Sequence, residues 1–313
     1  MLISAFMQPI WQAIAQHLSE ATGDPLQPLQ YRSVSGGSIN ATYRLSCGQK
    51  NYSKDYFVKL ARGGRAGVMG ALEMFAAEAA GLQTLAAANA IRVPQPLVWG
   101  SAGEQAYLVL EYLDLTSPRS QTASLLGSQL AQLHRTLSPN GRYGWERNNT
   151  IGSTPQINPW EQDWLDFYRE HRLLYQVKLA CQQGYRGQWV TQVERVMAEL
   201  EAFFQGYRPD PALLHGDLWG GNYGALPDGT PVIFDPALYY GDRETDLAMT
   251  ELFGGFPAEF YQAYQRAYPL DPGYPRRKPL YQLYHWLNHL NLFGEGYMGS
   301  VSRALQQCLS FLA

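Results

Sequence analysis

The spacing of apolar residues changes once along the chain, and this change divides the sequence into two parts. In the first part, β-favouring residues alternate or cluster in short runs that glycine-rich and polar segments separate. The predicted strands lie at residues 30–34, 41–45, 56–60, 96–100 and 106–113. Between the third and fourth of them, the alanine-, leucine- and glutamate-rich stretch 71–88 has helical spacing. This part predicts a small antiparallel sheet with one main helix.

In the second part, apolar residues recur with the helical period. The predicted helices lie at residues 122–137, 160–183, 188–206, 257–267 and 279–293. A short apolar run at 231–234 predicts a buried strand between them. We therefore expect an α+β protein with two lobes. Its predicted parts are an N-terminal helix at 1–24, a sheet lobe at 25–113 and a larger, mainly helical lobe at 114–313.

The charge balance gives no reason to expect a polyanionic partner. The 313 residues include 24 basic and 27 acidic side chains, for a net charge of −3, so no overall field favours nucleic acid or an anionic membrane. No apolar run approaches the roughly 18 residues that span a bilayer, and the first residues lack the basic start of a signal peptide. The three scattered cysteines, Cys47, Cys181 and Cys308, fit neither a disulfide framework nor a cysteine-based metal site. We expect a cytoplasmic protein that binds neither nucleic acid nor membranes.

The residues with the clearest chemical meaning lie in the stretch 213–235. Asn222 follows Asp217 after four intervening residues, and Asp235 stands at the end of the predicted strand 231–234. In phosphoryl transfer, one carboxylate accepts the proton of the attacking hydroxyl, while an amide oxygen and a second carboxylate hold Mg²⁺ on the nucleotide phosphates. This order is typical of the metal-binding hairpin of kinases and predicts Asp217 as the base, with Asn222 and Asp235 as magnesium ligands. Taken singly, Asp217 and Asn222 also fit ordinary turn-forming residues.

Two histidines close to apolar residues are better explained as structural. His215 precedes Asp217 by two positions and follows Leu213 and Leu214, so we expect it to anchor the loop by hydrogen bonds rather than to act in catalysis. His134 lies on the apolar face of a predicted helix, which favours a buried histidine with satisfied partners.

The segment SGGSIN, residues 35–40, connects two predicted strands and is the candidate phosphate-binding loop. Because glycine has no side chain, the backbone N–H groups of Gly36, Gly37 and Ser38 are able to approach phosphate oxygens. The alternative is a simple hairpin turn.

A lysine and a glutamate complete the candidate phosphate site. Lys59 is an ammonium on an otherwise apolar strand, where strand alternation points it away from Val58 and Leu60. Glu78, in the predicted helix 71–88, is the expected counter-ion, and Glu73 is the competing choice. The alternative for Lys59 is an ordinary solvated lysine.

The end of the last strand leads into a linker near residues 111–117. Backbone N–H and C=O groups of Glu111, Tyr112 and Leu113 are available there to bind the edge of an adenine ring between the lobes. ATP with Mg²⁺ is therefore the expected nucleotide ligand.

Several long stretches of the chain resemble one known family. They are SGGSIN, FVKL, PQINPWEQDWLDFYREHRL, PALLHGDLWGGN, IFDPALYYGDRETDLAM, LFGGFP and YQLYHWLNHLNLFG, and they run through nearly the whole sequence. The sequence is similar to the fructosamine kinase (ketosamine 3-kinase) family, a branch of the protein-kinase-like fold that is close to aminoglycoside and choline kinases.

The resemblance implies ATP-dependent phosphorylation of the 3-hydroxyl of a ketosamine, either a small molecule or a protein-bound adduct. The phosphorylated adduct of such enzymes is unstable and releases the amine, so that the reaction removes the sugar. Carried over from the family, Asp217 is the proton acceptor, Asn222 and Asp235 hold magnesium, and Lys59 with Glu78 binds phosphate. A kinase of the same fold that acts on an aminoglycoside, choline or homoserine hydroxyl is the alternative.

One position departs from the family pattern. Many members have a cysteine in the glycine-rich loop that is able to join two subunits, whereas this chain has Ser38 there. We therefore expect a monomer or a weak dimer without a disulfide at this loop.

The acceptor pocket is less well defined by the sequence. A ketosamine is a polyol attached to an amine, so its pocket needs hydrogen-bonding side chains, an aromatic platform and a carboxylate near the cationic nitrogen. Trp219 is close to Asp217 and is a candidate wall of the sugar pocket. The further candidates are Asp242, Glu244, Trp286 and Asn288. The helix 279–293 that carries the last two equally fits a plain core helix with a few buried amides.

Overall fold

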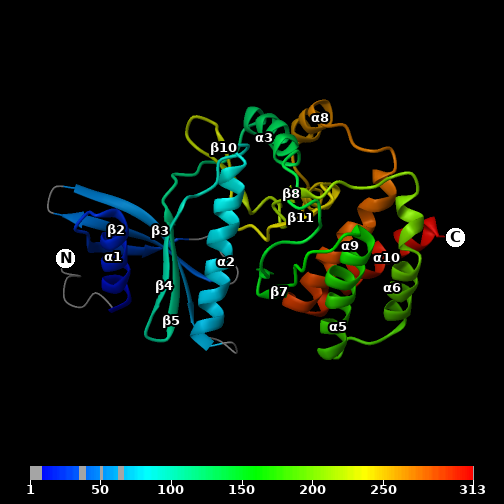
Figure 1. The fold of residues 1–313 in the computed structure, drawn as a ribbon, viewed down its shortest axis with the longest axis horizontal. Coiled ribbons are helices and arrows are strands. Elements are labelled where there is room, and N and C mark those ends of the chain that lie inside the picture. The colour runs from blue at the N-terminus through cyan, green and yellow to red at the C-terminus, as the bar shows by residue number, and fades with distance from the viewer. Residues whose placement is uncertain (1–8, 35–39, 50–51, 63–66, 313) are drawn as a thin grey trace.

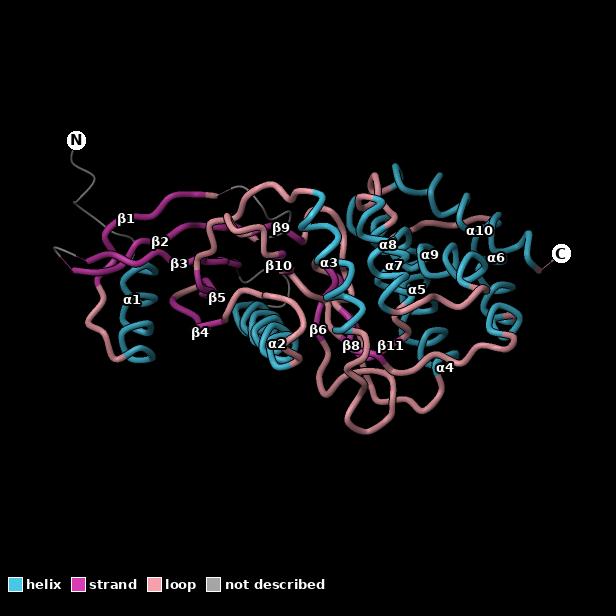
Figure 2. The backbone as a smooth tube through the Cα atoms, turned by 90° about the horizontal axis from the view of Figure 1, so that it is seen from above, coloured by secondary structure: helices cyan, strands magenta, loops and turns pink. Residues whose placement is uncertain are grey.

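The computed structural model describes residues 9–34, 40–49, 52–62 and 67–312, and it has two lobes (Figure 1). The N-terminal lobe contains a five-stranded antiparallel sheet with the strand order β1-β2-β3-β5-β4. Its strands are β1 (Gln27–Ser33), β2 (Ala41–Gln49), β3 (Tyr52–Arg62), β4 (Pro96–Ala102) and β5 (Gln105–Glu111). Two helices flank the sheet, α1 (Pro9–Thr22) and α2 (Gly67–Ala87), and α2 lies on the side of the C-terminal lobe (Figures 1 and 2).

The two faces of this sheet bury different side chains, because neighbouring residues of a strand point in opposite directions. On β3, Tyr56 and Val58 join the core under α1, whereas Phe57 packs against the core that α2 shares with the C-terminal lobe. Lys59 has the same parity as Phe57 and is buried on the α2 side. Strand alternation therefore delivers one ammonium group to the junction of the lobes.

The C-terminal lobe consists mainly of helices. They are α3 (Ser120–Leu133), α4 (Trp164–Tyr168), a π-helix (Arg169–Leu174), α5 (Tyr175–Gln182), α6 (Gln188–Ala198), a 3₁₀-helix (Leu200–Phe204), α7 (Glu244–Thr250), α8 (Ala258–Ala267), α9 (Tyr274–Phe293), a 3₁₀-helix (Glu295–Tyr297) and α10 (Met298–Phe311). Within the described residues, none of the helices combines the length and apolar content that crossing a membrane requires.

Six short strands of the C-terminal lobe form three antiparallel pairs. They are β6 (Asn149–Ile151) with β7 (Thr154–Gln156), β9 (Tyr223–Ala225) with β10 (Pro231–Ile233), and β8 (Ala212–Leu214) with β11 (Tyr239–Gly241). All three pairs lie on the side of this lobe that is nearer to the sheet (Figures 1 and 2).

The predicted α+β fold with two lobes is confirmed, with differences at the ends of several helices. The helix predicted at 160–183 begins only at Trp164, because the Asp163 carboxylate accepts hydrogen bonds from the N–H groups of the first turn. The helix predicted at 279–293 begins earlier, at Tyr274, because Pro275 occupies the first turn, where its missing N–H costs nothing.

Two helices were not predicted. Every residue of α7 is buried, so its sequence has no amphipathic period to detect. In α10 the buried residues, Val301, Ala304, Leu305 and Cys308, do follow a helical period, so this helix could have been predicted from the sequence.

A buried ionic network ties α7 to α9. Arg277 donates to both carboxylate oxygens of Glu244, at 2.7 and 2.9 Å, and the two side chains are almost fully shielded from solvent. The neighbouring Asp242 carboxylate accepts hydrogen bonds from the hydroxyl groups of Tyr207 and Tyr281. Burial and the charge of Asp242 raise the pKa of Glu244 to about 8, although Arg277 acts in the opposite direction. The guanidinium therefore compensates an acidic cluster that would otherwise be costly to bury.

We predict that Arg277→Met lowers the free energy of unfolding by about 3 to 5 kcal/mol, because it leaves Glu244 in the core without its cation. The loss is largest above about pH 8, the pKa of Glu244 in the folded protein, and becomes smaller as the pH falls through this value, since the carboxyl then takes up a proton and no longer needs a counter-ion. The double variant Arg277→Met, Glu244→Gln loses less than Arg277→Met alone above this pH. Denaturant unfolding of the three proteins measures this, and a double variant that is less stable than Arg277→Met contradicts it.

Candidate active site

The polar residues of the stretch 213–235 lie on a loop and a hairpin between the lobes. β8 leads into the loop that carries Asp217, and β9 pairs with β10 in the hairpin that ends at Asp235. The Phe234 N–H donates to the Asn222 carbonyl at 3.0 Å, which brings Asp235 close to Asn222. Asp235 has a φ of +58°, a left-handed conformation that is uncommon outside glycine. Such strain persists where the surrounding structure fixes a functional side chain.

The loop of Asp217 is anchored by the buried carboxylate of Asp246, on α7. Asp246 accepts hydrogen bonds from the N–H groups of His215 and Gly216, both at 2.8 Å, and from His134 Nε2 at 3.2 Å. Burial raises the pKa of Asp246, but its hydrogen bond to His134 and the nearby imidazoles outweigh burial and lower it. The carboxylate thus satisfies two backbone donors that have no access to water. Asp246 was not predicted as part of the site; its only sign in the sequence is that it is the last acidic residue of the stretch GDRETDLAM.

His215 joins the two halves of the site. Its Nε2–H donates to the Phe234 carbonyl at 2.9 Å, and its Nδ1 accepts from the Asp217 N–H at 3.2 Å. Burial lowers the pKa of His215, which favours the neutral ring that this pattern requires. The imidazole therefore fixes the loop of Asp217 against the strand that ends in Asp235. His134 is also fully buried, and its Nδ1 lies 2.8 Å from the Tyr264 hydroxyl.

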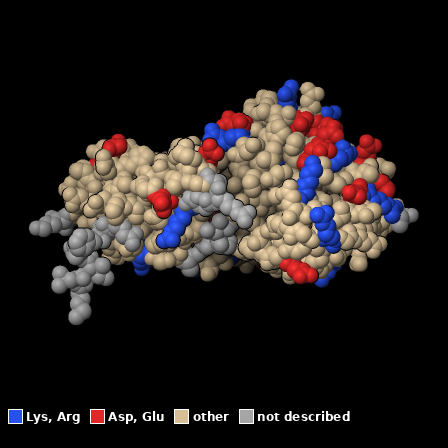
Figure 3. All heavy atoms as spheres, turned by 90° about the horizontal axis from the view of Figure 1, so that it is seen from below, with Lys and Arg blue, Asp and Glu red and all other residues tan. Residues whose placement is uncertain are grey.

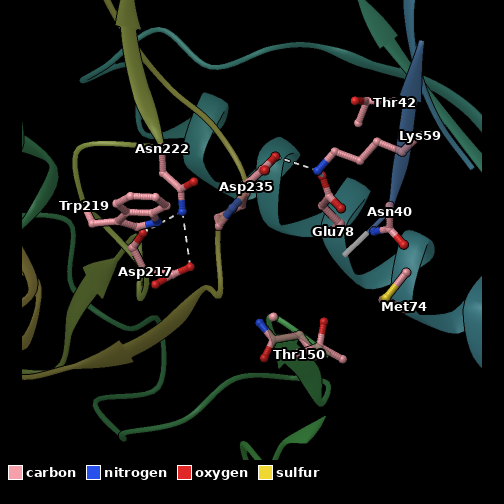
Figure 4. Close-up of a pocket in the computed structure, with 13 residues that line it drawn as sticks. Asn40, Thr42, Lys59, Met74, Glu78, Thr150, Asp217, Trp219, Asn222 and Asp235 are labelled. Carbon is pink, nitrogen blue, oxygen red and sulfur yellow. Dashed lines mark hydrogen bonds and ion pairs between the residues drawn. The ribbon is translucent and has the colours of Figure 1, made fainter. Parts of the chain in front are cut away.

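Lys59 connects the two lobes at this site (Figure 4). Its Nζ lies 2.6 Å from Glu78 Oε1 on α2 and 2.5 Å from Asp235 Oδ1 in the C-terminal lobe. Burial lowers the pKa of Lys59, but the two carboxylates outweigh it and raise the pKa above its usual value, so the ammonium stays charged. Of the two glutamates considered from the sequence, Glu78 is the partner of Lys59, while Glu73 is exposed.

Asp217, Asn222 and Asp235 line one pocket together with Lys59 and Glu78 (Figure 4). Asn222 Nδ2 donates to the main-chain carbonyl of Asp217 at 2.8 Å and to its carboxylate at 3.2 Å. The carbonyl oxygen of the same amide points away from Asp217 (Figure 4). Burial raises the pKa of the Asp217 carboxyl well above its usual value, and the charge of Asp235 adds to this effect. Five residues from three separate parts of the sequence thus line the same pocket.

The oxygen atoms at this point suit a hard divalent cation. The Asn222 amide and the Asp235 carboxylate both line the pocket, and Mg²⁺ binds oxygen ligands while keeping several positions for water or substrate phosphates. Among the residues that the structure describes, no group of three or more histidine, cysteine or acidic side chains is placed to hold a metal alone. A magnesium ion that shares its ligands between two protein oxygens and a nucleotide fits this donor set.

A second, mostly apolar pocket adjoins the linker after β5. It is lined by Phe57, Pro94, Leu110, Glu111, Leu113, Leu115, Gly221, Phe234 and Asp235. The Glu111 carboxylate is paired with Arg92 at 2.6 Å, and the Tyr112 ring lies under the Arg44 guanidinium at 4.5 Å. Both of these side chains have partners elsewhere, so the linker offers mainly its backbone and Leu113 to a planar ring. The predicted phosphate-loop residues Gly36, Gly37 and Ser38 lie outside the described residues.

Among the residues considered for the acceptor substrate, Trp219 lines the first pocket. Its ring contacts Phe253, with 5.7 Å between ring centres, and Phe253 contacts Trp286 at 5.3 Å. The three rings form a row that begins at the pocket, and Phe253 is 42% exposed. Asn288 is not among the pocket residues, because it is buried and accepts a hydrogen bond from Gln176.

Asp242 and Glu244 also lie away from the pocket. Both carboxylates are buried in the network between α7 and α9, where Arg277 and two tyrosine hydroxyls bind them. They were candidates because a ketosamine pocket needs a carboxylate near the cationic nitrogen, but no local pattern in the sequence indicates that the distant Arg277 binds Glu244. The structure therefore assigns these two carboxylates to packing rather than to the pocket wall.

Sequence reasoning missed the wall of the pocket that faces Asp217. The β6–β7 hairpin contributes Asn149, Thr150 and Gly152 to the lining, and Asn40 and Met74 contribute from the N-terminal lobe. The available signal was the turn-like stretch NTIGSTPQ, in which a glycine separates two short runs with β-branched residues.

We predict that Gly216→Ala disrupts the loop of Asp217. The new Cβ would lie 2.0 Å from the Ala237 carbonyl oxygen, at a φ of +83°. Gly229→Ala is the matched control, because its φ of +88° carries the same backbone cost while its nearest neighbouring atom is 3.8 Å away. Gly216→Ala should therefore cost at least about 1 to 3 kcal/mol more stability than Gly229→Ala, the usual cost of overpacking. Equal losses in denaturant unfolding would contradict this reading.

The sequence matches the model of the fructosamine kinase family over residues 10–311. A protein of Synechocystis sp. named "Probable ketoamine kinase" is 48% identical over 299 residues, which cover 96% of this chain and 97% of that protein. The "Protein-ribulosamine 3-kinase, chloroplastic" of Arabidopsis thaliana is 39% identical over 295 residues, which cover 93% of this chain and 86% of that one.

Solved structures agree with these matches. A Thermobifida fusca protein with the provisional description fructosamine-3-kinase has a TM-score of 0.82 at 31% identity, covering 96% of this chain and 99% of its own. A choline kinase of Streptococcus pneumoniae has a TM-score of 0.64 at 16% identity, covering 97% and 100%, and this likeness shows the protein-kinase-like fold alone. By its sequence over nearly its full length, the chain belongs to the fructosamine kinase family.

Proposed function

We propose that this protein is an ATP-dependent kinase that phosphorylates the 3-hydroxyl group of ketosamines. The observation that carries the proposal is the convergence of Asp217, Asn222 and Asp235 with the Lys59–Glu78 pair in one pocket between the lobes. This set contains a base, two oxygen ligands for magnesium and a cation for phosphate, which are the parts that phosphoryl transfer needs. Membership of the family supports the ketosamine as acceptor.

In this proposal ATP binds across the junction of the lobes. The adenine ring of ATP occupies the apolar pocket beside Leu113, and the phosphates of ATP extend toward Lys59. Asn222 and Asp235 hold Mg²⁺, which neutralises charge on the β- and γ-phosphates when bound. The ammonium of Lys59 then exchanges its contact with Asp235 for the phosphates, and Glu78 keeps it in position.

Asp217 acts on the acceptor hydroxyl. Its carboxylate accepts the proton as the hydroxyl oxygen forms a bond to the γ-phosphorus, while the bond between that phosphorus and the bridging oxygen of ADP breaks. The contact from Asn222 Nδ2 orients the carboxylate, and the two hydrogen bonds to Asp246 hold the loop beneath it. The base is thus fixed before the acceptor arrives, which lowers the entropic part of the barrier.

The aromatic row supports an acceptor that carries an amine and its substituent beside the sugar. Trp219 offers its ring face or edge to the sugar, and Phe253 and Trp286 extend the surface away from Asp217. Aromatic rings bind both apolar groups and organic cations, so this surface suits the secondary amine of a ketosamine and the side chain attached to it. We place the reaction in the cytoplasm, where ATP is abundant, and expect a monomer or a weak dimer.

We predict that Asp217→Asn lowers kcat by about 100-fold or more, the scale of a lost general base. Asp228→Asn is the matched control, since this carboxylate lies in the exposed turn of the neighbouring β9–β10 hairpin and is not among the residues that line the pocket. ADP release in the presence of Mg-ATP and a synthetic ribulosamine or fructosamine measures both variants.

Two outcomes of that assay contradict the proposal. If the unaltered protein forms no ADP above background with any ketosamine, the proposed substrate class is wrong. If it prefers an aminoglycoside, choline or homoserine by kcat/KM, the alternative acceptor is correct while the kinase mechanism stands.

The lysine gives a further prediction. Lys59→Met removes a charge-assisted contact to phosphate, which is worth about 1.5 to 3 kcal/mol, so kcat/KM for ATP should fall roughly 10- to 150-fold. Lys54→Met, on the same strand but exposed, is the control and should leave kcat/KM for ATP within about twofold, as expected for a surface substitution. An unchanged kcat/KM in Lys59→Met would show that ATP phosphates bind elsewhere.

A further inference from the structure

The β6–β7 hairpin faces Asp217 across the pocket, yet no residue of the nucleotide or magnesium apparatus comes from it. Thr150 lies on the pocket side of β6, with the labelled side chains of Asp217 and Asp235 above it in the view of Figure 4. Asn149 and Gly152 line the same wall, and Gly152 has a φ of +62° in the turn between the strands. The hairpin therefore closes the pocket on the side where an acceptor must approach the base.

Side-chain amides fasten this hairpin to the segment that follows Asp235. Asn149 Nδ2 donates to the Leu238 carbonyl at 2.8 Å, and Gln156 Nε2 donates to the Ala237 carbonyl at 2.9 Å. Gln156 Nε2 also donates to Asn149 Oδ1 at 2.9 Å, which couples the two strands. Because these amides are occupied, Asn149 and Gln156 fix the wall and leave recognition to another side chain.

A buried arginine supports the hairpin from behind. Arg172 donates to Asn158 Oδ1 at 2.7 Å and to the Ile157 carbonyl at 2.8 Å, and Asn158 in turn donates to Asn149 Oδ1 at 2.9 Å. The guanidinium is fully buried, and among the described residues no carboxylate forms an ion pair with it. It lies 4.1 Å from the centre of the Tyr239 ring, which compensates part of the cost of burying the charge.

The position of Arg172 is itself unusual. It lies in the π-helix Arg169–Leu174, between α4 and α5, and such insertions occur mostly as single turns and frequently at functional sites. A buried, unpaired cation is costly, so a protein that needed only packing there would be more stable with an apolar residue. The arrangement fits a requirement for a rigid pocket wall.

Thr150 is the residue of this wall that remains available to a ligand. It is partly exposed to the pocket, and its hydroxyl makes no hydrogen bond within the described part of the chain. A threonine hydroxyl both donates and accepts, so it is able to pair with any hydroxyl of a polyol. The β-branched side chain has few rotamers on a strand, which limits the entropy lost on binding.

We infer that the β6–β7 hairpin is the acceptor-recognition wall, in which Thr150 hydrogen-bonds a sugar hydroxyl next to the one that reacts. Arg172 is a positioning residue that acts through Asn158 and Asn149 to set the distance between Thr150 and Asp217. The inference rests on the proposed function for the nature of the acceptor, a ketosamine polyol, and adds the residues that select it.

The test compares Thr150→Val, which removes only the hydroxyl, with Thr150→Ser, which keeps it. A neutral hydrogen bond contributes about 1 kcal/mol, so Thr150→Val should raise KM for the ketosamine about fivefold, with kcat and KM for ATP unchanged. In Thr150→Ser, KM for the ketosamine should stay within about twofold of its value in the unaltered protein. A panel of monodeoxy ketosamines identifies the recognised hydroxyl. The unaltered protein should bind the analogue that lacks this hydroxyl less tightly than the complete ketosamine, whereas Thr150→Val should bind the two equally.

Arg172→Lys keeps the charge but loses the planar fork that binds Asn158 and Ile157 together. We expect a higher KM for the acceptor and a lower kcat, while KM for ATP is unchanged. A purely structural role would instead lower thermal stability and the fraction of active protein, with KM for the acceptor unaltered, and that result would reject the positioning role.

An unchanged acceptor KM in Thr150→Val would overturn the assignment of the wall. Failure of the proposed function is a separate result, because it appears in the unaltered protein as an absence of ketosamine phosphorylation. In that case the same variants are assayed with the acceptor that the unaltered protein does phosphorylate. Thr150→Val should then raise KM for that acceptor.

Discussion

The ammonium of Lys59 is the point at which the two lobes of this protein depend on each other. It is buried between Glu78 of the N-terminal lobe and Asp235 of the C-terminal lobe, so each lobe supplies one carboxylate to a charge that neither could bury alone. Strand alternation on β3 puts the ammonium there, because its parity directs it toward α2 and away from α1. A nucleotide that replaces Asp235 as the partner of Lys59 would therefore sense the relative position of the lobes.

The rest of the site is a frame that keeps polar groups fixed without water. Asp246 satisfies two N–H groups of the loop that carries Asp217, and His215 connects this loop to the strand before Asp235. The geometry thus depends on buried charges and hydrogen bonds that are individually costly to lose. Glu244, which forms a buried ion pair with Arg277 of α9, lies on the same helix, α7, as Asp246.

The sequence predicted the fold class and the residues that meet in the pocket, since both left local signals. The change of apolar period revealed two lobes, and the spacing of Asp217, Asn222 and Asp235 carried a chemical meaning. It could not reveal which polar residues are buried by long-range partners. Asp242 and Glu244 are carboxylates of the kind that a substrate amine would need, but Arg277 and the tyrosine hydroxyls bind them in the core. The positions of Thr150 and Phe253 near the site could not be predicted from the sequence, because only the folded chain brings the β6–β7 hairpin and the aromatic row close to Asp217.

The central claim is transfer of the γ-phosphate of ATP to the 3-hydroxyl of a ketosamine, and the position of the phosphate in the product tests it most directly. The account predicts that ³¹P NMR of a reaction with Mg-ATP and a ribulosamine labelled with ¹³C at carbon 3 shows a new phosphate ester coupled to that carbon, formed in step with ADP. If ADP forms from the earliest times with inorganic phosphate alone, before an unstable ester could break down, or with an ester at another carbon, the account is contradicted.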